Sequence, residues 1–207
     1  MSYADDIARI TQLVLHERQG RDRGWWDQLA DSFYPDGKVR ISWFQGTGRE
    51  FAVRSKGMSD SGNKALHRLC PPIIHLQGDR AFVEISGAIE FRIDVNGIPA
   101  DLCSFTRLYF KVERTDGLWR VKLFTAVYER DTLMPSIPGQ VITVDVDEIK
   151  KYRTAYAMIS WFLNSKGFPI KNDLLGDDRP EEVDKFYAGL WSWLNTGVDS
   201  YERELES

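Results

Sequence analysis

The chain has 207 residues, 43% apolar and 13% aromatic, so it can bury a sizeable core and line an apolar cavity. Its net charge of −4 and the absence of a long basic block argue against binding to nucleic acid. No apolar stretch is long enough for a membrane span or a signal peptide, so we expect a cytoplasmic protein that enters no membrane.

The cysteines and histidines form no metal-binding pattern. Cys70 and Cys103 match no metal or redox spacing, and the three histidines are far apart in the sequence. We therefore predict two buried, reduced thiols and a protein that uses neither a metal nor an organic cofactor.

The first third of the chain is predicted to be mainly helical. Apolar residues recur at helical spacing over Asp5–Glu17, and "GRDRG" at residues 20–24 interrupts the pattern. A second helix follows over residues 25–33 and is stopped by "YPDG". "KVRISWF" at 38–44 then predicts a short strand, and "REFAVRSKGMS" at 49–59 a short third helix.

Long strands make up the middle of the chain. A short strand ends at the "GD" turn of residues 78–79, after which residues 81–95 alternate between apolar and polar side chains. The turn signal Asn96–Gly97 leads into a strand over about 100–113, and "TDG" leads into a last strand over 118–130. Three long antiparallel strands in series predict a strongly twisted and curved sheet.

Helical spacing returns after residue 139, with one helix predicted over Asp147–Asn164 and another over 177–194. Helices that are segregated from an antiparallel sheet predict an α+β fold. We expect the curved sheet to wrap around the N-terminal helices as a cone domain over residues 1–139. Residues 140–207 are expected to form a C-terminal helical extension, whose aromatic side chains pack against the cone or a second subunit.

Three stretches, in this order, resemble a known family. They are "GRDRGWWDQLADSFYPDGKVRISW", "ALHRLCPPIIHLQGDRAFVE" and "GLWRVKLFTAVYERDTLMPSIPG", all within residues 5–139. Together they resemble the SnoaL-like, or scytalone dehydratase-like, branch of the nuclear transport factor two-like superfamily. The resemblance implies an open apolar cone in which a histidine, held by an aspartate, acts as acid and base.

The resemblance assigns the aspartate to Asp22 and the histidine to His67. Two tyrosine positions of the dehydratase pattern fall on Arg21 and on or near Trp43, and its second histidine should lie near Ile89–Phe91, where this chain has none. These departures argue against the dehydration of scytalone itself, but they leave the cone intact.

Neutral imidazole can take a proton from carbon and return it to a leaving hydroxyl, which makes His67 the candidate general acid/base. We expect a cofactor-independent dehydratase, isomerase or cyclase for a hydrophobic cyclic substrate, such as a polyketide- or steroid-like compound. Its cone is expected to be lined by the following apolar and aromatic residues: Trp43, Ile89, Phe91, Tyr109 and Tyr128. The alternative is a non-catalytic ligand-binding or structural subunit, like the small subunit of ring-hydroxylating dioxygenases.

His75 and Arg107 are predicted to have structural roles. His75 lies near the end of its strand and is expected to play no part in the chemistry. Arg107 interrupts an apolar run, so we place it on the outer face of the sheet, paired with Glu90 or Glu129. Because relatives with this fold often associate through that face, a homodimer or homotrimer is expected.

Overall fold

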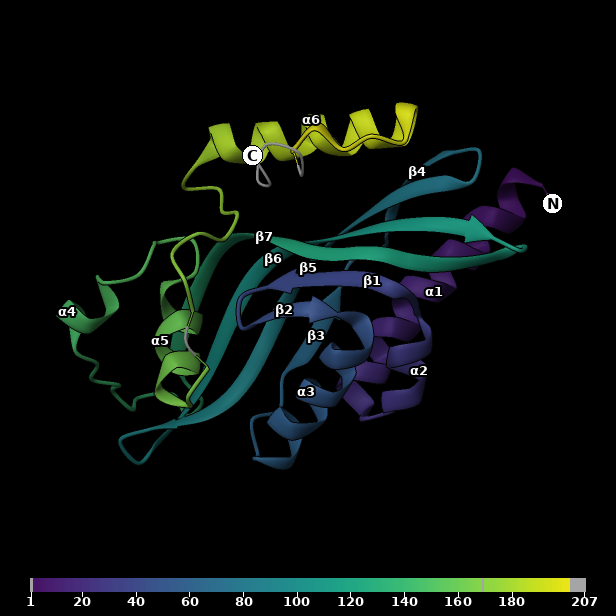
Figure 1. Cartoon of the computed structure of the whole chain (residues 1–207). Helices are drawn as coiled ribbons and strands as arrows, with labels where there is room; N and C mark the ends of the chain where they lie inside the picture. The colour runs from purple at the N-terminus through teal and green to yellow at the C-terminus, as the bar shows by residue number, and fades with distance from the viewer. Residues whose placement is uncertain (1, 169, 202–207) are drawn as a thin grey trace.

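A computed structural model describes residues 2–168 and 170–201 of the chain, and its centre is a curved sheet (Figure 1). The long strands β5 (Arg80–Val95), β6 (Ile98–Thr115) and β7 (Leu118–Pro135) pair antiparallel, as the alternating pattern predicted. Asn96 and Asp116 adopt left-handed φ angles of 55° and 53°, each followed by glycine, so both connections are tight hairpin turns.

Shorter strands extend the sheet on both sides, giving the order β2-β1-β7-β6-β5-β3, with β4 also paired to β5. β1 (Phe33–Ile41) lies parallel to β7 and is antiparallel to β2 (Phe44–Thr47), so the sheet is not wholly antiparallel. On the other side, β3 (Leu66–Leu69) and β4 (Ile73–Gln77) both pair with β5.

Three helices occupy the concave side of the sheet: α1 (Tyr3–Arg23), α2 (Trp26–Asp31) and α3 (Gly48–Asp60). The predicted break at residue 20 is wrong, because α1 continues to Arg23 and ends at left-handed Gly24. A Cβ on Gly20 would lie only 3.0 Å from the backbone nitrogen of Leu29 in α2. Gly20 therefore marks a close contact between helices, and α1 keeps its last turn beside the cone.

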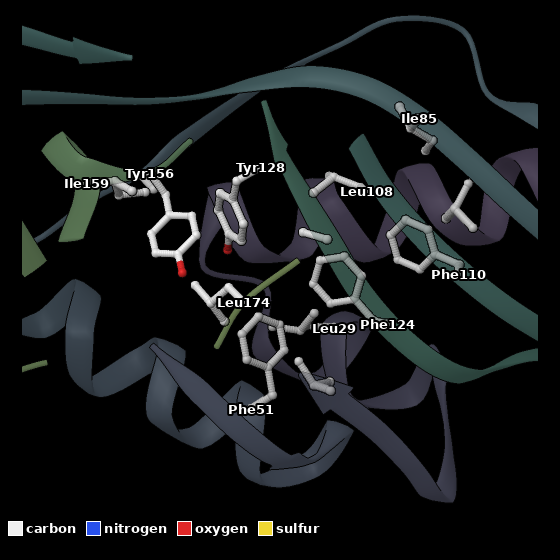
Figure 2. Packing of buried hydrophobic residues seen from close by; sticks show 14 of the residues in the cluster. Leu29, Phe51, Ile85, Leu108, Phe110, Phe124, Tyr128, Tyr156, Ile159 and Leu174 are labelled. Carbon is white, nitrogen blue, oxygen red and sulfur yellow. The ribbon is translucent and has the colours of Figure 1, made fainter. Parts of the chain in front are cut away.

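The cone interior is filled where the helices meet the concave face of the sheet. Figure 2 shows Leu108, Phe124 and Tyr128 from the sheet pointing toward Leu29 and Phe51 from the helices. Phe110 and Phe124 stack with their ring centroids 4.7 Å apart. Alternate residues of each long strand therefore supply the core, as period-two patterning requires.

The C-terminal extension contains α4 (Val146–Ile149), α5 (Ala157–Ser165) and α6 (Pro180–Thr196). The prediction of a single helix over 147–164 is wrong, because the helical structure is interrupted between α4 and α5. The break allows Tyr156 to enter the cone, where it is fully buried 5.5 Å from the ring of Tyr128 (Figure 2). Burial of this aromatic side chain outweighs the local helical spacing.

Helix α6 lies across the opposite face of the sheet from α1–α3 (Figure 1). It forms a second apolar cluster with the outward side chains Phe82, Tyr109 and Val127. Helix α6 therefore covers part of the outer sheet face. In the part of the chain that the structure describes, no helix has the length and apolarity needed to cross a membrane.

Candidate active site

Asp22 and His67 form a hydrogen-bonded pair at the wall of the cone. The ring Nδ1 of His67 lies 2.6 Å from Asp22 Oδ1, and the backbone N–H of His67 donates to Asp22 Oδ2 at 2.8 Å. An ionised carboxylate only accepts hydrogen bonds, so Nδ1 carries the ring hydrogen and Nε2 keeps its lone pair. The pair thus fixes both the orientation and the tautomer of His67.

Local structure brings these two residues together. Asp22 lies in the last turn of α1, on the same helix face as Arg18, four residues earlier. His67 is the second residue of β3 and stands opposite Ile89 of β5, whose side chain also faces the cone. The contact between Asp22 and His67 that the family resemblance implied is therefore present in the geometry.

Burial controls the protonation of the pair. Burial lowers the pKa of His67 below its ordinary value, and the hydrogen bond to Asp22 opposes this without cancelling it. Burial on its own raises the pKa of Asp22, but the hydrogen bonds from His67 and the charge of Arg18 hold it below the usual range. Near neutral pH the imidazole is therefore a neutral base beside an ionised carboxylate.

Arg18 is a residue of the site that the sequence analysis missed. Its Nη1 lies 3.3 Å from Nε2 of His67, and its guanidinium stands over the ring of Phe124, 4.3 Å from the centroid. The other edge of the guanidinium is paired with Glu17, and both side chains are buried. The spacing of Arg18 to Asp22 was visible in the sequence, but the supposed break after residue 19 concealed it.

A cavity extends from this pair into the cone. Of the predicted lining residues, Trp43, Ile89, Phe91 and Tyr128 border it, and Ile159 and Leu163 of α5 close it from the extension. Trp43 also meets the ring of Phe168, with centroids 5.9 Å apart, so the C-terminal extension contacts the wall of the cavity.

A family model described as a SnoaL-like domain matches residues 2–125, more than half of the chain. The chain belongs to the SnoaL-like domain family.

Among relatives of this SnoaL-like protein, Pea pathogenicity protein 2 of Fusarium vanettenii is 28% identical, and the match covers 93% of this chain and 87% of the relative. An uncharacterized protein of Emericella nidulans is 26% identical, with 84% and 80% covered. At 93% of this chain, the first match reaches well into the C-terminal extension.

Solved structures share the fold of the SnoaL-like chain. A hexachlorocyclohexane dehydrochlorinase, LinA type 2, superposes with a TM-score of 0.57 at 17% identity, covering 66% of this chain and 97% of that one. A putative scytalone dehydratase from Novosphingobium aromaticivorans gives 0.51 at 16% identity, with 68% and 94% covered. At sequence identities of 16–17%, the similarity shows a shared fold and nothing further.

Tyr109 does not line the cone of this SnoaL-like protein, and that prediction is wrong. Its ring lies on the outer face of the sheet, 5.0 Å from Phe186 of α6. Arg107 occupies the same face, where it pairs with Glu129 and with Glu84, while Glu90 pairs with Arg68. Residues two apart in a strand share a face, so Arg107 outside requires Tyr109 outside.

His75 and the cysteines also lie apart from the SnoaL-like cavity. The His75 ring packs between Phe82 and Trp191 on the outer face, with each centroid 4.6 Å away. This position agrees with the structural role predicted for His75. Both cysteines are free, but neither is buried as predicted. Cys70, which follows the last residue of β3, is exposed, and Cys103 is half-buried. Within residues 2–168 and 170–201, no group of three or more His, Cys, Asp or Glu side chains could hold a metal ion.

Proposed function

We propose that the protein is a small-molecule acid/base enzyme of the dehydratase or isomerase type, with His67 as the proton-transferring residue and Asp22 as its orienting partner. The observation that supports this most directly is the 2.6 Å contact between Nδ1 of His67 and Asp22, at the wall of an aromatic cavity. A neutral, buried imidazole with a fixed tautomer is suited to taking a proton from carbon.

The proposed reaction begins when Nε2 of His67 removes a proton from a carbon of the bound substrate. The electron pair of that C–H bond forms a double bond as a leaving group departs, or it moves to a neighbouring carbonyl oxygen. Arg18, 3.3 Å from Nε2, lies where it can stabilise the negative charge that develops. The imidazolium, stabilised by Asp22, then returns its proton to the leaving group or to another carbon.

A hydrogen-exchange experiment tests this without knowledge of the natural substrate. The protein is incubated in D₂O with a panel of cyclic ketones and hydroxyketones, and loss of the α-proton signal is followed by NMR. We expect catalysed exchange with at least one compound, and its reduction by about 10²- to 10⁴-fold in His67→Gln. His16→Gln is the matched control, since His16 is an exposed histidine on α1.

Two outcomes would contradict the proposal that the protein is an acid/base enzyme. Exchange that persists at full rate in a folded His67→Gln variant excludes His67 as the base. Binding of the panel without any exchange favours the alternative, a non-catalytic ligand-binding protein with the same cone. That alternative is supported by one observation, the partial closure of the cavity by Ile159, Leu163 and the Trp43–Phe168 contact.

A further inference from the structure

Arg21 is a second arginine in the cone, and no carboxylate among the described residues forms an ion pair with it. Its side chain is 4% exposed and borders the same cavity as His67. In the described part of the chain, its one hydrogen bond goes from Nη2 to the sulfur of Met58 at 3.3 Å, and no carboxylate forms an ion pair with it. A thioether is a weak acceptor, so most of the five N–H donors of Arg21 are unused.

The nearby carboxylates are already engaged. Asp22 accepts from His67 with both of its oxygens, and both oxygens of Glu17 are bound to Arg18. These two charges favour the cationic form of Arg21 through space, but burial has the larger effect and lowers the pKa of Arg21 to about 10. The guanidinium therefore remains charged at neutral pH, with its hydrogen-bonding capacity unmet.

A purely structural role does not account for this burial. A cation in the last turn of a helix interacts favourably with the helix dipole, but Arg23 in the same turn achieves this from the surface. Burying a guanidinium in an apolar site without a hydrogen-bonded anion costs roughly several kcal/mol of folding free energy. A ligand that brings an anion into the cavity would offset that cost.

We propose that Arg21 binds an oxyanion of the substrate, and that the substrate is a hydrophobic compound carrying one carboxylate or acidic enolate. This rests on the proposed function, because it names the substrate class of the same cavity. The two planar oxygens of a carboxylate match the fork of the guanidinium, and an enolate oxygen accepts from one of its N–H groups. His67 and Arg18 then face the rest of the substrate, and the aromatic wall holds its hydrocarbon part.

Calorimetric titration with matched probes tests the proposal. Cyclohexanecarboxylate is compared with cyclohexanecarboxamide, its neutral isostere, and with 5,5-dimethylcyclohexane-1,3-dione, which is an enolate at neutral pH. We expect wild type to prefer at least one anion over the carboxamide by about 10- to 100-fold, the range for a hydrogen bond to a charged group. The stronger of the two anions identifies the chemistry as carboxylate or enolate.

Variants test whether Arg21 is responsible for the preference for anions over the carboxamide. Arg21→Gln is expected to reduce the ratio to about 1, Arg21→Lys to retain part of it, and Arg92→Gln, which removes an exposed arginine, to leave it unchanged. His67→Gln is expected to keep the preference, since binding needs no proton transfer; exchange and binding can therefore fail independently. Equal binding of anions and carboxamide by wild type, no binding of either anion, or an unchanged ratio in Arg21→Gln overturns the proposal.

A crystal structure of the wild type with cyclohexanecarboxylate covers the case in which Arg21→Gln does not fold. A carboxylate oxygen within about 3 Å of an Arg21 nitrogen supports the assignment. A carboxylate bound to another residue of the cavity, with Arg21 still turned to Met58, overturns it.

Discussion

Replacing Asp22 by asparagine tests whether the carboxylate fixes the reactive tautomer of His67. Asp22 receives two N–H groups of the same residue, one from the ring and one from the backbone. An asparagine side chain has one acceptor oxygen and one NH₂ donor, so one of these N–H groups must face a donor. The backbone N–H cannot move, whereas the ring hydrogen can transfer to Nε2.

The expected consequence is a change of tautomer. With the asparagine oxygen on the backbone N–H, its NH₂ donates to Nδ1, and the ring hydrogen moves to Nε2. Nε2 then points a hydrogen at Nη1 of Arg18, 3.3 Å away, and no longer offers a lone pair to a substrate. The opposite amide orientation leaves the half-buried backbone N–H of His67 without its acceptor, which costs about 1 kcal/mol. Proton exchange should fall by about 10²- to 10⁴-fold, because the base has lost its acceptor site.

The tautomer can be measured directly without a substrate. Long-range ¹H–¹⁵N spectra of protein labelled at histidine distinguish an Nδ1–H ring from an Nε2–H ring. We expect Nδ1–H in wild type and Nε2–H in Asp22→Asn, with Asp31→Asn, an exposed acid on α2, resembling wild type. An Asp22→Asn protein that keeps both the Nδ1–H tautomer and full proton exchange would refute the reasoning.

Two further predictions concern stability. Burial raises the pKa of Asp131, which accepts a hydrogen bond from the backbone N–H of Ile159, to about 6 from an ordinary value of 3.8. Stability should therefore fall relative to Asp131→Asn as pH rises from about 3 to about 7, by about 3 kcal/mol at roughly 1.4 kcal/mol per pKa unit; a difference in unfolding free energy that does not vary with pH would contradict this. Phe186→Ala should cost about 3–5 kcal/mol in denaturant unfolding, because Phe186 is buried between α6 and the outer sheet face. It should leave the tautomer of His67 unchanged, and a loss below about 1 kcal/mol would show that α6 is only loosely attached.

The three long strands could be predicted because period two and tight turns are local signals, but the two histidines show where local signals end. In an unbroken strand, His67 and His75 would share a face. The structure places His67 opposite Ile89 and His75 opposite Phe82, and the register shifts by one residue between β3 and β4. Proline lacks the N–H that would continue the ladder, so the Pro71–Pro72 pair separates the two strands and reverses the facing.

The site itself was only partly predictable, for a related reason. The pairing of Asp22 with His67 followed from the family resemblance. Arg18 was missed because Gly20 was taken as a helix breaker, although a glycine inside a helix can also allow a second helix to approach closely. Spacing within one element cannot distinguish these roles, because the deciding contact comes from Leu29, nine residues further along the chain.

The final turns of α1 carry Glu17, Arg18, Arg21 and Asp22, and three of these side chains are at least 95% buried. Apolar residues of similar size would usually serve the fold equally well or better, because buried ions lose their hydration. Glu17 forms an ion pair with Arg18, and Asp22 orients His67. Glu17, Arg18 and Asp22 therefore each have a partner in the site. The family resemblance aligns Arg21 with a tyrosine of the dehydratase pattern, a neutral donor suited to a carbonyl oxygen. A guanidinium at that position favours a ligand that is already negatively charged, which is the difference that the paired carboxylate and carboxamide probes measure.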